Sequence, residues 1–365
     1  MKALRAISEQ ILTWYARHKR DLPWRNTRNP YFVWVSEVML QQTQVDIVIP
    51  YYHRFLKQFP TVEALAKASL QDVLKAWENM GYYARARHLH AAAQEIVKRT
   101  GGVVPNTWDE LISLPGIGTY TAAAILSFAF GKRFPTVDGN AQRVLCRLYA
   151  IQGPIDQSST QREIHDLAAQ IIPSEDPSNF NHGIMELGAT MCKPRNPQCH
   201  ICPVGDLCLA FQKGLQEVLP VMKKRKPLPH KEITAAVIRD NRGRLLIVQR
   251  PNQGLLGGLW KFPGGMRETD ETLQQGLRRQ VREELGVGIK VREALASVDH
   301  AYTHFRITLH AFQCARQNGK PRAIGCDKYQ WVKIDSLGDF PFSRADRKVI
   351  EVLLEKDGQK QADKP

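Results

Sequence analysis

Residues 114–121 read LPGIGTYT, and an apolar run, AAAILSFAF, follows directly over residues 122–130. The proline and the two glycines, Gly116 and Gly118, predict a tight turn whose backbone N–H groups can face outward, and the apolar run predicts a helix from Thr121 to about residue 130. A helix N-terminus presents unpaired N–H groups and a partial positive charge. This turn is therefore expected to bind an anion, and phosphate is the first candidate.

Two carboxylates in unlike surroundings form a candidate acid pair. Asp138 lies beside a glycine in VDGN, residues 137–140. Glu37 lies within FVWVSEVML, residues 32–40, a segment that is otherwise almost entirely apolar. Because burial raises the pKa of a carboxylic acid, a glutamate in such a segment is a candidate proton donor.

The 365 residues, enough for two or three domains, carry 51 Lys and Arg against 36 Asp and Glu, a formal net charge of +15. The excess lies mainly after residue 220, where the net charge is +11. This balance indicates a polyanion as the partner, and the C-terminal part is expected to clamp it.

No apolar run approaches the roughly 20 residues that a membrane-spanning helix requires. Residues 1–20 mix apolar side chains with arginine and lysine, and they predict an amphipathic helix, not a signal peptide. We therefore expect a cytoplasmic protein without a membrane partner.

Four of the seven cysteines have the spacing Cys-x6-Cys-x2-Cys-x5-Cys. They are Cys192, Cys199, Cys202 and Cys208. Four thiolates so close together in a reducing cytosol indicate a metal or a metal cluster, not disulfides. Zinc and a four-iron cluster both accept four thiolates. Because only one close Cys-x2-Cys pair occurs, an iron–sulfur cubane is favoured, and structural zinc stays the alternative.

Two motifs in the helical first half suit contact with nucleic acid. LQQTQ, residues 40–44, contains Gln41 and Gln42, whose amides can hydrogen-bond base edges beside a leucine that can wedge into a base stack. GYYARAR, residues 81–87, places Tyr82 and a second tyrosine before two arginines, a pattern typical of base stacking with phosphate contact.

The sequence changes character after residue 222. Residues 223–231 begin KKRKPLP and predict a basic linker without periodicity. The pattern that follows predicts an α+β domain over residues 232–356 and a disordered tail over 357–365. Its first two strands, 233–238 and 245–248, are joined by the turn DNRG and predict a β-hairpin. The other predicted elements are a helix over 271–285, strands over 294–299, 305–314 and 328–334, and a final helix over 344–356.

Together, the hairpin turn, VDGN and the cysteine spacing resemble the helix-hairpin-helix superfamily of DNA glycosylases, which includes endonuclease III and the MutY-type adenine DNA glycosylases. Residues 34–43, WVSEVMLQQT, match the MutY type closely. Endonuclease III has a lysine nucleophile two residues after the second glycine of the hairpin, and this chain has Tyr120 there. Since tyrosine cannot form a Schiff base, the resemblance implies hydrolysis without strand cleavage.

The resemblance covers essentially the whole chain. It implies an all-α helix-hairpin-helix glycosylase domain with a 4Fe-4S cluster loop over residues 1–222, followed by the α+β domain as a Nudix-like domain that recognises 8-oxoguanine. Within the first domain, a six-helix part spans about 22–133, and the N-terminal helix joins residues 134–222 in a cluster-bearing part.

The same resemblance assigns roles to individual residues. Glu37 protonates adenine at N7 and handles the attacking water, while Asp138 stabilises or transiently bonds the sugar cation. Tyr120 and Asn140 orient Asp138 and that intermediate. The DNA- and base-binding set comprises Trp24 and Arg25 in the wall of the adenine pocket, Gln42 and Tyr82 intercalating near the lesion, Gln41 beside them, and Gly116 and Gly118 in the hairpin.

One position departs from the family pattern. Some members have a glutamate directly after the Phe-Asn that precedes the cysteines, and this chain has His182 there. We therefore assign no adenine-contacting carboxylate at this position. Partial substitution by His182 and a structural role for it both stay open.

Residues 265–287 resemble the Nudix box, with Gln280 where the box expects glutamate. Glu283 and Glu284 remain as possible ligands of Mg²⁺ or Mn²⁺ on the same helix face as position 280. The domain is therefore either a relic or an active pyrophosphohydrolase that acts on oxidised nucleotides. Between two predicted strands, Tyr302, Thr303 and His304 stand where MutY proteins carry Phe-Ser-His, the loop that reads 8-oxoguanine.

We thus expect a monomeric base-excision-repair glycosylase whose partner is double-stranded DNA containing adenine opposite 8-oxoguanine or guanine, associated with the nucleoid through that DNA. It hydrolyses the N-glycosidic bond of the mispaired adenine with a 4Fe-4S cluster as cofactor. The alternative is a bifunctional protein whose C-terminal domain also hydrolyses oxidised nucleoside triphosphates with Mg²⁺ or Mn²⁺.

Overall fold

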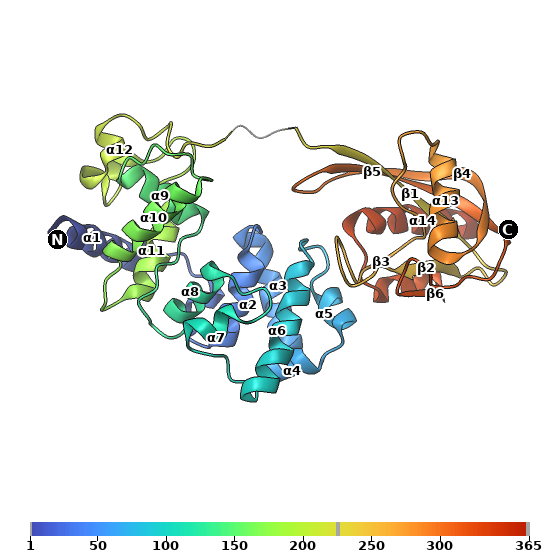
Figure 1. Cartoon of the computed structure of the whole chain (residues 1–365), viewed down its shortest axis with the longest axis horizontal. Coiled ribbons are helices and arrows are strands. Elements are labelled where there is room, and N and C mark those ends of the chain that lie inside the picture. The colour runs from blue at the N-terminus through green and yellow to red at the C-terminus, as the bar shows by residue number, and fades with distance from the viewer. Residues whose placement is uncertain (1, 224–226, 363–365) are drawn as a thin grey trace. The chain divides into compact units, whose positions relative to one another are not determined.

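The computed structural model describes residues 2–223 and 227–362, and the chain forms two compact units (Figure 1). The first unit consists of residues 1–67 and 91–225, and the second of residues 68–90 and 226–365. Residues 68–90, which the sequence pattern places in the helical domain, group with the C-terminal part. Glu78 explains part of this grouping, because its carboxylate accepts hydrogen bonds from Arg347 and from the backbone N–H of Phe342.

The first unit is built from helices with short connections, as predicted. Its helices are α1 (Lys2–His18), α2 (Pro30–Leu40), α3 (Val45–Gln58), α4 (Val62–Lys67), α7 (Trp108–Ile112), α8 (Thr119–Phe128), α9 (Gly139–Leu148), α10 (Ser158–Ile171), α11 (Pro177–Thr190) and α12 (Leu209–Gln212). Helix α6 (Ala84–Thr100) runs from the second unit into the first, and α5 (Leu70–Ala76) belongs to the second.

Two helices of the first unit are buried on nearly all sides because their sequences are apolar all round. Helix α2 begins at Pro30, whose fixed φ suits the first helical position, and the side chain of Asn29 caps it by accepting from the N–H of Tyr31. Helix α8 packs against α2. This packing places the polar residues of both helices, Glu37 and Tyr120, inside the protein.

A second group of helices forms another core within the first unit. Helices α1, α9, α10 and α11 share one hydrophobic cluster, which includes Ile11, Leu145, Ile164 and Leu187. Helices α9 and α11 approach closely at Gly188, where a Cβ atom would lie 2.7 Å from the Cβ of Asn140. Glycine at this position therefore lets α11 support the start of α9.

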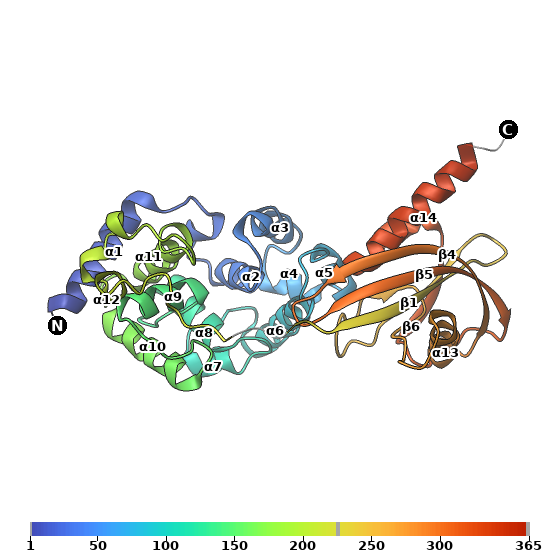
Figure 2. The same cartoon turned by 90° about the horizontal axis from the view of Figure 1, so that it is seen from above.

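The second unit contains two three-stranded sheets, with strand orders β1-β5-β4 and β3-β2-β6. The strands are β1 (His230–Ile238), β2 (Leu245–Gln249), β3 (Trp260–Lys261), β4 (Gly288–Ala301), β5 (Arg306–Asn318) and β6 (Lys328–Val332). Alternate residues of β1 face two cores: Ala235 and Val237 pack with α14 (Arg344–Ala362), and Ala236 and Ile238 pack with α13 (Leu273–Leu285). Figure 2 shows α13 and α14 on opposite sides of these strands.

The predicted hairpin of residues 233–238 and 245–248 is wrong. Strand β1 pairs in parallel with β5 along its whole length, whereas β2 lies in the other sheet between β3 and β6. Only an isolated bridge, Arg239 with Leu245, joins the two strands beside the turn. Residues 234–238 of β1 and all of β2 are buried on both faces, so their sequences carry no alternation that would fix them as neighbours.

The predicted disordered tail also differs from the structure. Helix α14 continues to Ala362, and residues 363–365 lie outside the described part. An ion pair of 2.6 Å between Asp357 and Arg239 holds the extension against the turn after β1. None of the helices in the described residues is both long and apolar enough to cross a membrane.

Candidate active site

A cavity of about 480 Å³ in the first unit collects most of the residues predicted to act in catalysis and base binding. Glu37, Tyr120, Asp138 and Asn140 line it, although the sequence separates the first from the last by about 100 residues. The base-binding candidates Trp24, Arg25, Gln41 and Gln42 also line it, as do Arg20, His182 and Glu186.

Glu37 is an almost fully buried acid, with 3 % of its surface exposed. Burial raises its pKa to about 7, and the nearby charge of Asp138 acts in the same direction. The hydroxyl of Tyr120 donates a hydrogen bond of 2.9 Å to Oε2 of Glu37 and opposes this rise. A proton therefore stays available on Glu37 near neutral pH.

Tyr120, which was predicted to orient Asp138 and the sugar intermediate, donates its hydroxyl hydrogen bond to Glu37. Burial and the charge of Glu37 raise the pKa of Tyr120 well above its usual value. The side chain is therefore a neutral hydrogen-bond donor to the acid.

Asp138 caps the N-terminus of α9. Its Oδ1 accepts from the N–H of Ala141 at 2.7 Å, and its Oδ2 accepts from the amide of Asn140 at 2.9 Å. Burial raises the pKa of Asp138, whereas these hydrogen bonds and the charge of Arg143 favour its ionised form. The positive end of the helix stabilises the same form.

Arg143 connects this carboxylate to the cysteine segment. Its guanidinium donates to Oδ1 of Asn140 and to the carbonyl of Gly188, both at 2.8 Å, and to the carbonyl of Cys192 at 2.8 Å. Asn140, which holds Asp138, is therefore itself fixed by an arginine that spans α9, α11 and the first cysteine.

Glu186 lines the cavity and was not predicted from the sequence. It is fully buried and accepts from Arg20 and Arg25, with both ion-pair distances 2.7 Å. The hydrogen bonds from these arginines outweigh its burial and lower its pKa to about 2. Its position four residues after His182 could have indicated its role, because residues i and i+4 share a helix face.

His182 lies between aromatic rings. Its imidazole stacks on Phe128 with ring centroids 3.9 Å apart and faces Tyr15 at 6.3 Å. Burial, followed by the charge of Arg25, lowers its pKa to about 3. The side chain is therefore a neutral wall of the cavity.

Several residues predicted to contact DNA have a backbone with positive φ. Gly116 has φ of +73°, which glycine adopts without strain, and Gly118 precedes α8 without a side-chain cap, so the first N–H groups of the helix stay open. Gln42 and Tyr82 also have positive φ, 56° and 47°. Gln41 donates to the hydroxyl of Thr121 at 3.3 Å. Tyr82 belongs to the second unit.

The four clustered cysteines line a single small cavity together with Arg147. This arginine is buried and donates to Sγ of Cys192 at 3.3 Å and to the carbonyl of Lys193 at 2.6 Å. Within the described residues, no three His, Cys, Asp or Glu side chains are placed to hold a single metal ion. Four thiols around one cavity with a buried cation beside them fit an anionic four-iron cluster better than one zinc ion.

The Nudix-like box does not fit a divalent cation. Glu284 is buried and forms an ion pair of 2.8 Å with Lys261, and the N–H of Gly264 donates to its other oxygen. The ammonium of Lys261 also contacts the carbonyl of Gly264. Glu283 instead pairs with Arg279 at 3.2 Å. The predicted Mg²⁺ or Mn²⁺ ligands therefore face cations of the chain itself.

Tyr302, Thr303 and His304 form the tip between β4 and β5, as predicted. The N–H of Tyr302 donates to the carbonyl of Phe305 at 2.8 Å, and the two rings lie 4.9 Å apart. Thr303 and His304 are exposed at the tip.

The fold and the site define a base-excision DNA glycosylase of the helix-hairpin-helix class. Residues 35–174 match the HhH-GPD superfamily base excision DNA repair protein, residues 192–208 match the iron-sulfur binding domain of endonuclease III, and residues 234–352 match the NUDIX domain. A thermostable thymine-DNA glycosylase superposes with a TM-score of 0.54 at 31 % identity over 58 % of this chain and 98 % of its own. A non-covalent endonuclease III–DNA complex gives 0.51 at 26 % identity over 59 % and 98 %.

Whole-chain relatives narrow this class. The adenine DNA glycosylases of Homo sapiens and Rattus norvegicus are 36 % and 35 % identical to this chain over 95 % and 96 % of it, and over 74 % and 78 % of their own lengths. That of Buchnera aphidicola is 33 % identical over 82 % of this chain and 83 % of its own. The chain belongs to the MutY-type adenine DNA glycosylase family.

Proposed function

We propose that this chain hydrolyses the N-glycosidic bond of adenine opposite 8-oxoguanine or guanine in duplex DNA, and that it does so without cutting the strand. The observation that carries the proposal is the pair of Glu37 and Asp138 in one cavity. One carboxyl keeps its proton to near neutral pH, and the other is held by two donors at a helix N-terminus.

The two carboxyls match the two demands of the reaction. Protonation by Glu37 turns adenine into a better leaving group, and the ionised Asp138 stabilises the cationic sugar that develops as the bond breaks. Asn140 orients Asp138 through its 2.9 Å hydrogen bond. Two carboxyls in unlike environments are the usual way to divide such roles.

Tyr120 supports the absence of strand cleavage. Its hydroxyl donates to Glu37, and no amine stands at this position to form a Schiff base with the sugar. Water is therefore the final acceptor of the sugar.

Arg25 supports binding of an extruded base. It lines the cavity, its Nη2 is held by Glu186, and its buried Nε has no hydrogen-bond partner among the described residues. An acceptor on the base would satisfy this donor. Extrusion itself requires groups that fill the stack and grip the strand, and the proposed groups are Gln42, Tyr82 and the open N–H groups of the hairpin turn.

We further propose that Cys192, Cys199, Cys202 and Cys208 hold a 4Fe-4S cluster. When bound, the cluster cross-links the segment through iron–thiolate bonds and tunes its interaction with DNA. The proposed DNA-bound species is a monomer, and the tip at Tyr302, Thr303 and His304 reads 8-oxoguanine.

A glycosylase assay on duplexes with adenine opposite 8-oxoguanine, guanine or cytosine tests the proposal. We expect release of adenine opposite 8-oxoguanine and guanine, and strand breaks only after alkali. Breaks without alkali would contradict hydrolysis alone, and equal release opposite cytosine would contradict the proposed mispair specificity.

For the C-terminal domain we propose binding without hydrolysis. The buried pair of Lys261 and Glu284 places the chain's own ammonium against the carboxylate that a metal ion would need. The full chain, incubated with 8-oxo-dGTP and Mg²⁺ or Mn²⁺, should release no pyrophosphate. Pyrophosphate release by the wild-type chain would overturn this proposal.

A further inference from the structure

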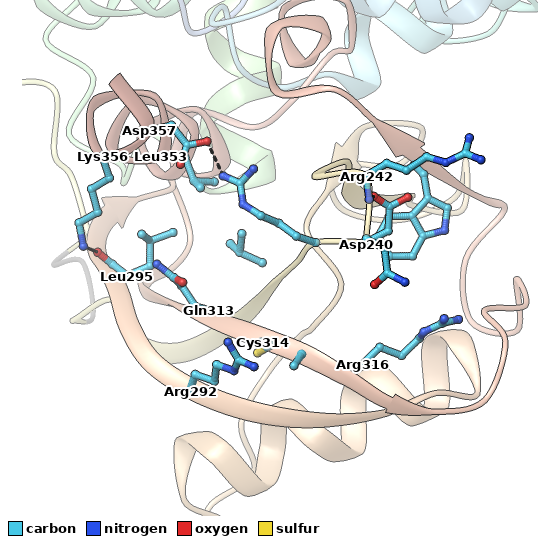
Figure 3. Close-up of a pocket in the computed structure, with 15 residues that line it drawn as sticks. Asp240, Arg242, Arg292, Leu295, Gln313, Cys314, Arg316, Leu353, Lys356 and Asp357 are labelled. Atoms are coloured by element: carbon cyan, nitrogen blue, oxygen red, sulfur yellow. Dashed lines mark hydrogen bonds and ion pairs between the residues drawn. The ribbon is translucent and has the colours of Figure 1, made fainter. Parts of the chain in front are cut away.

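A second cavity, of about 510 Å³, lies within the C-terminal part of the second unit (Figure 3). It is lined by the end of β1 and its following turn, by β4, β5 and β6, and by α14. None of its lining residues belongs to the Nudix-like box or to the 302–304 tip. It is therefore a separate feature of the fold.

The lining of this cavity is strongly basic. Five cationic residues and two acidic residues contribute side chains, a formal excess of three positive charges. The cationic residues are Arg239, Arg242, Arg292, Arg316 and Lys356, and the acidic residues are Asp240 and Asp357. A concave surface of one charge sign focuses the electrostatic potential and attracts counter-charged ligands.

Both acidic residues are already neutralised. Asp357 pairs with Arg239 at 2.6 Å, and Asp240 pairs at 2.8 Å with Arg244, which does not line the cavity. The charge that remains is therefore that of the other four cations.

Those four cations have no carboxylate partner among the described residues. Arg316 and Lys356 donate only to backbone carbonyls, at 3.2 Å and 3.3 Å. The side chains of Arg242 and Arg292 make no hydrogen bond or ion pair within residues 2–223 and 227–362, and both are exposed. In Figure 3, Arg242 and Arg316 lie on one side of the cavity, and Arg292 and Lys356 lie toward the other. An anion that binds in the cavity lowers the repulsion among the cations around it.

The rest of the lining suits the organic part of a nucleotide. Trp331 has a partly buried indole, which can stack on a base. Leu295 and Leu353 form an apolar part of the wall. Asn241 and Gln313 add amides that can donate to or accept from a base or a sugar.

The size of the cavity limits the ligand. Small-molecule pockets usually span about 300–1,000 Å³, and this cavity falls within that range. A duplex, whose major groove alone is about 12 Å wide, is too large to be enclosed. We propose that this cavity binds a single phosphate-bearing nucleotide, either free or as one unit of a single strand, and that its unpaired cations, Arg242 and Arg292 among them, attract the phosphate. The site is separate from the glycosylase cavity and does not depend on the function proposed for it.

Calorimetric titration of the full-length protein without divalent cations tests this inference. The probes are dTTP and 5′-phosphorylated oligothymidylate, because thymine avoids the cavity proposed to take adenine, and inorganic tripolyphosphate separates phosphate binding from base binding. Arg242→Ala/Arg292→Ala should weaken binding of dTTP, of the oligonucleotide or of both at least tenfold. Lys290→Ala is the matched control, because Lys290 is an exposed cationic side chain on β4 that does not line the cavity.

The probes distinguish the two sources of the nucleotide. A loss for dTTP identifies a free nucleotide as ligand, and a loss for the oligonucleotide alone identifies a strand. Binding of tripolyphosphate as tight as that of dTTP would overturn the role of the base. Equal binding of dTTP and oligonucleotide by wild type and double variant, or no binding of either, would overturn the site. The variant is expected to fold, because the side chains of both arginines make no hydrogen bond or ion pair among the described residues. An unchanged melting curve by circular dichroism checks this.

Discussion

At the scale of single residues, Glu37 combines two properties that oppose each other. Its burial in α2 keeps a proton available near neutral pH, and the same burial makes its ionised form costly to the fold. The proposed catalytic acid is therefore also a group whose ionisation destabilises the fold.

Glu37→Gln should abolish adenine release, because the amide keeps the shape of the side chain but cannot donate the proton. General acid catalysis contributes about 10²- to 10⁴-fold, so we expect a loss of at least that size in the single-turnover rate. Retained binding of a mismatched duplex is the control. Near wild-type release by the variant would exclude Glu37 as the acid.

The same substitution should stabilise the protein at alkaline pH. The pKa of Glu37 is raised from 4.5 to about 7 in the fold, so its contribution to stability is fully present below pH 4.5 and is lost as pH rises through 7. The difference corresponds to about 3 kcal/mol at pH 8. Urea unfolding should show the variant more stable than wild type at pH 8, with a much smaller difference at pH 5. An equal gain at both pH values would contradict this origin.

Tyr120→Phe should move the pH dependence of adenine release upward. The Tyr120 hydrogen bond favours the ionised form of Glu37, so its loss raises the pKa of Glu37 further and extends the active range to higher pH. Single-turnover rates from pH 6 to 9 measure the shift of the alkaline limb. A limb that stays in place or moves downward would show that Tyr120 does not set this pKa.

At the scale of elements, the turn around Gly116 and the buried helices α2 and α8 follow from local sequence. The turn around Gly116, the apolar helix after it and the apolar segment around Glu37 were all predicted, because periodicity and turn residues act over short distances. The gathering of the four cysteines around one cavity was predicted from their spacing alone, for the same reason.

What the sequence did not show were partners far apart in the chain. Tyr120 binds Glu37 across 83 positions, and Glu186 binds Arg20 across 166. No periodicity encodes such pairs, and the hydrogen bond from Tyr120 to Glu37 was not predicted for this reason. The parallel pairing of β1 with β5 was missed likewise, since buried strands carry no alternation that identifies their neighbours.

The approach of α11 to α9 gives an element-scale prediction. In Gly188→Ala the new methyl group would lie 2.7 Å from Cβ and 2.8 Å from the backbone oxygen of Asn140, so the two helices must separate. Overpacking of this kind costs about 1–3 kcal/mol, and it should also lower the rate of adenine release by displacing Asn140 from Asp138. Gly338→Ala, where a Cβ meets open space, is the control for thermal unfolding. Full activity in Gly188→Ala would show that α11 does not position the carboxylate.

At the scale of the whole molecule, residues 68–90 belong by sequence to the helical half and by structure to the second unit. The chain therefore passes between the units at three points, near residues 67, 90 and 225. Within the second unit, Gln71 accepts from the indole of Trp260 at 2.8 Å, and Glu78 pairs with Arg347 at 2.6 Å.

Glu78→Ala should therefore loosen the second unit around this inserted segment. The carboxylate of Glu78 is largely buried and satisfies both the guanidinium of Arg347 and the N–H of Phe342, so its loss leaves two donors without their acceptor. The expected cost is about 1–3 kcal/mol, seen as a lower thermal midpoint and faster proteolysis within residues 68–90. Lys75→Ala is the control, because it removes the more exposed partner of the same carboxylate and leaves both of those donors satisfied. In a double-mutant cycle with Arg347→Ala, a coupling energy near zero would mean that the ion pair does not hold the segment in the second unit.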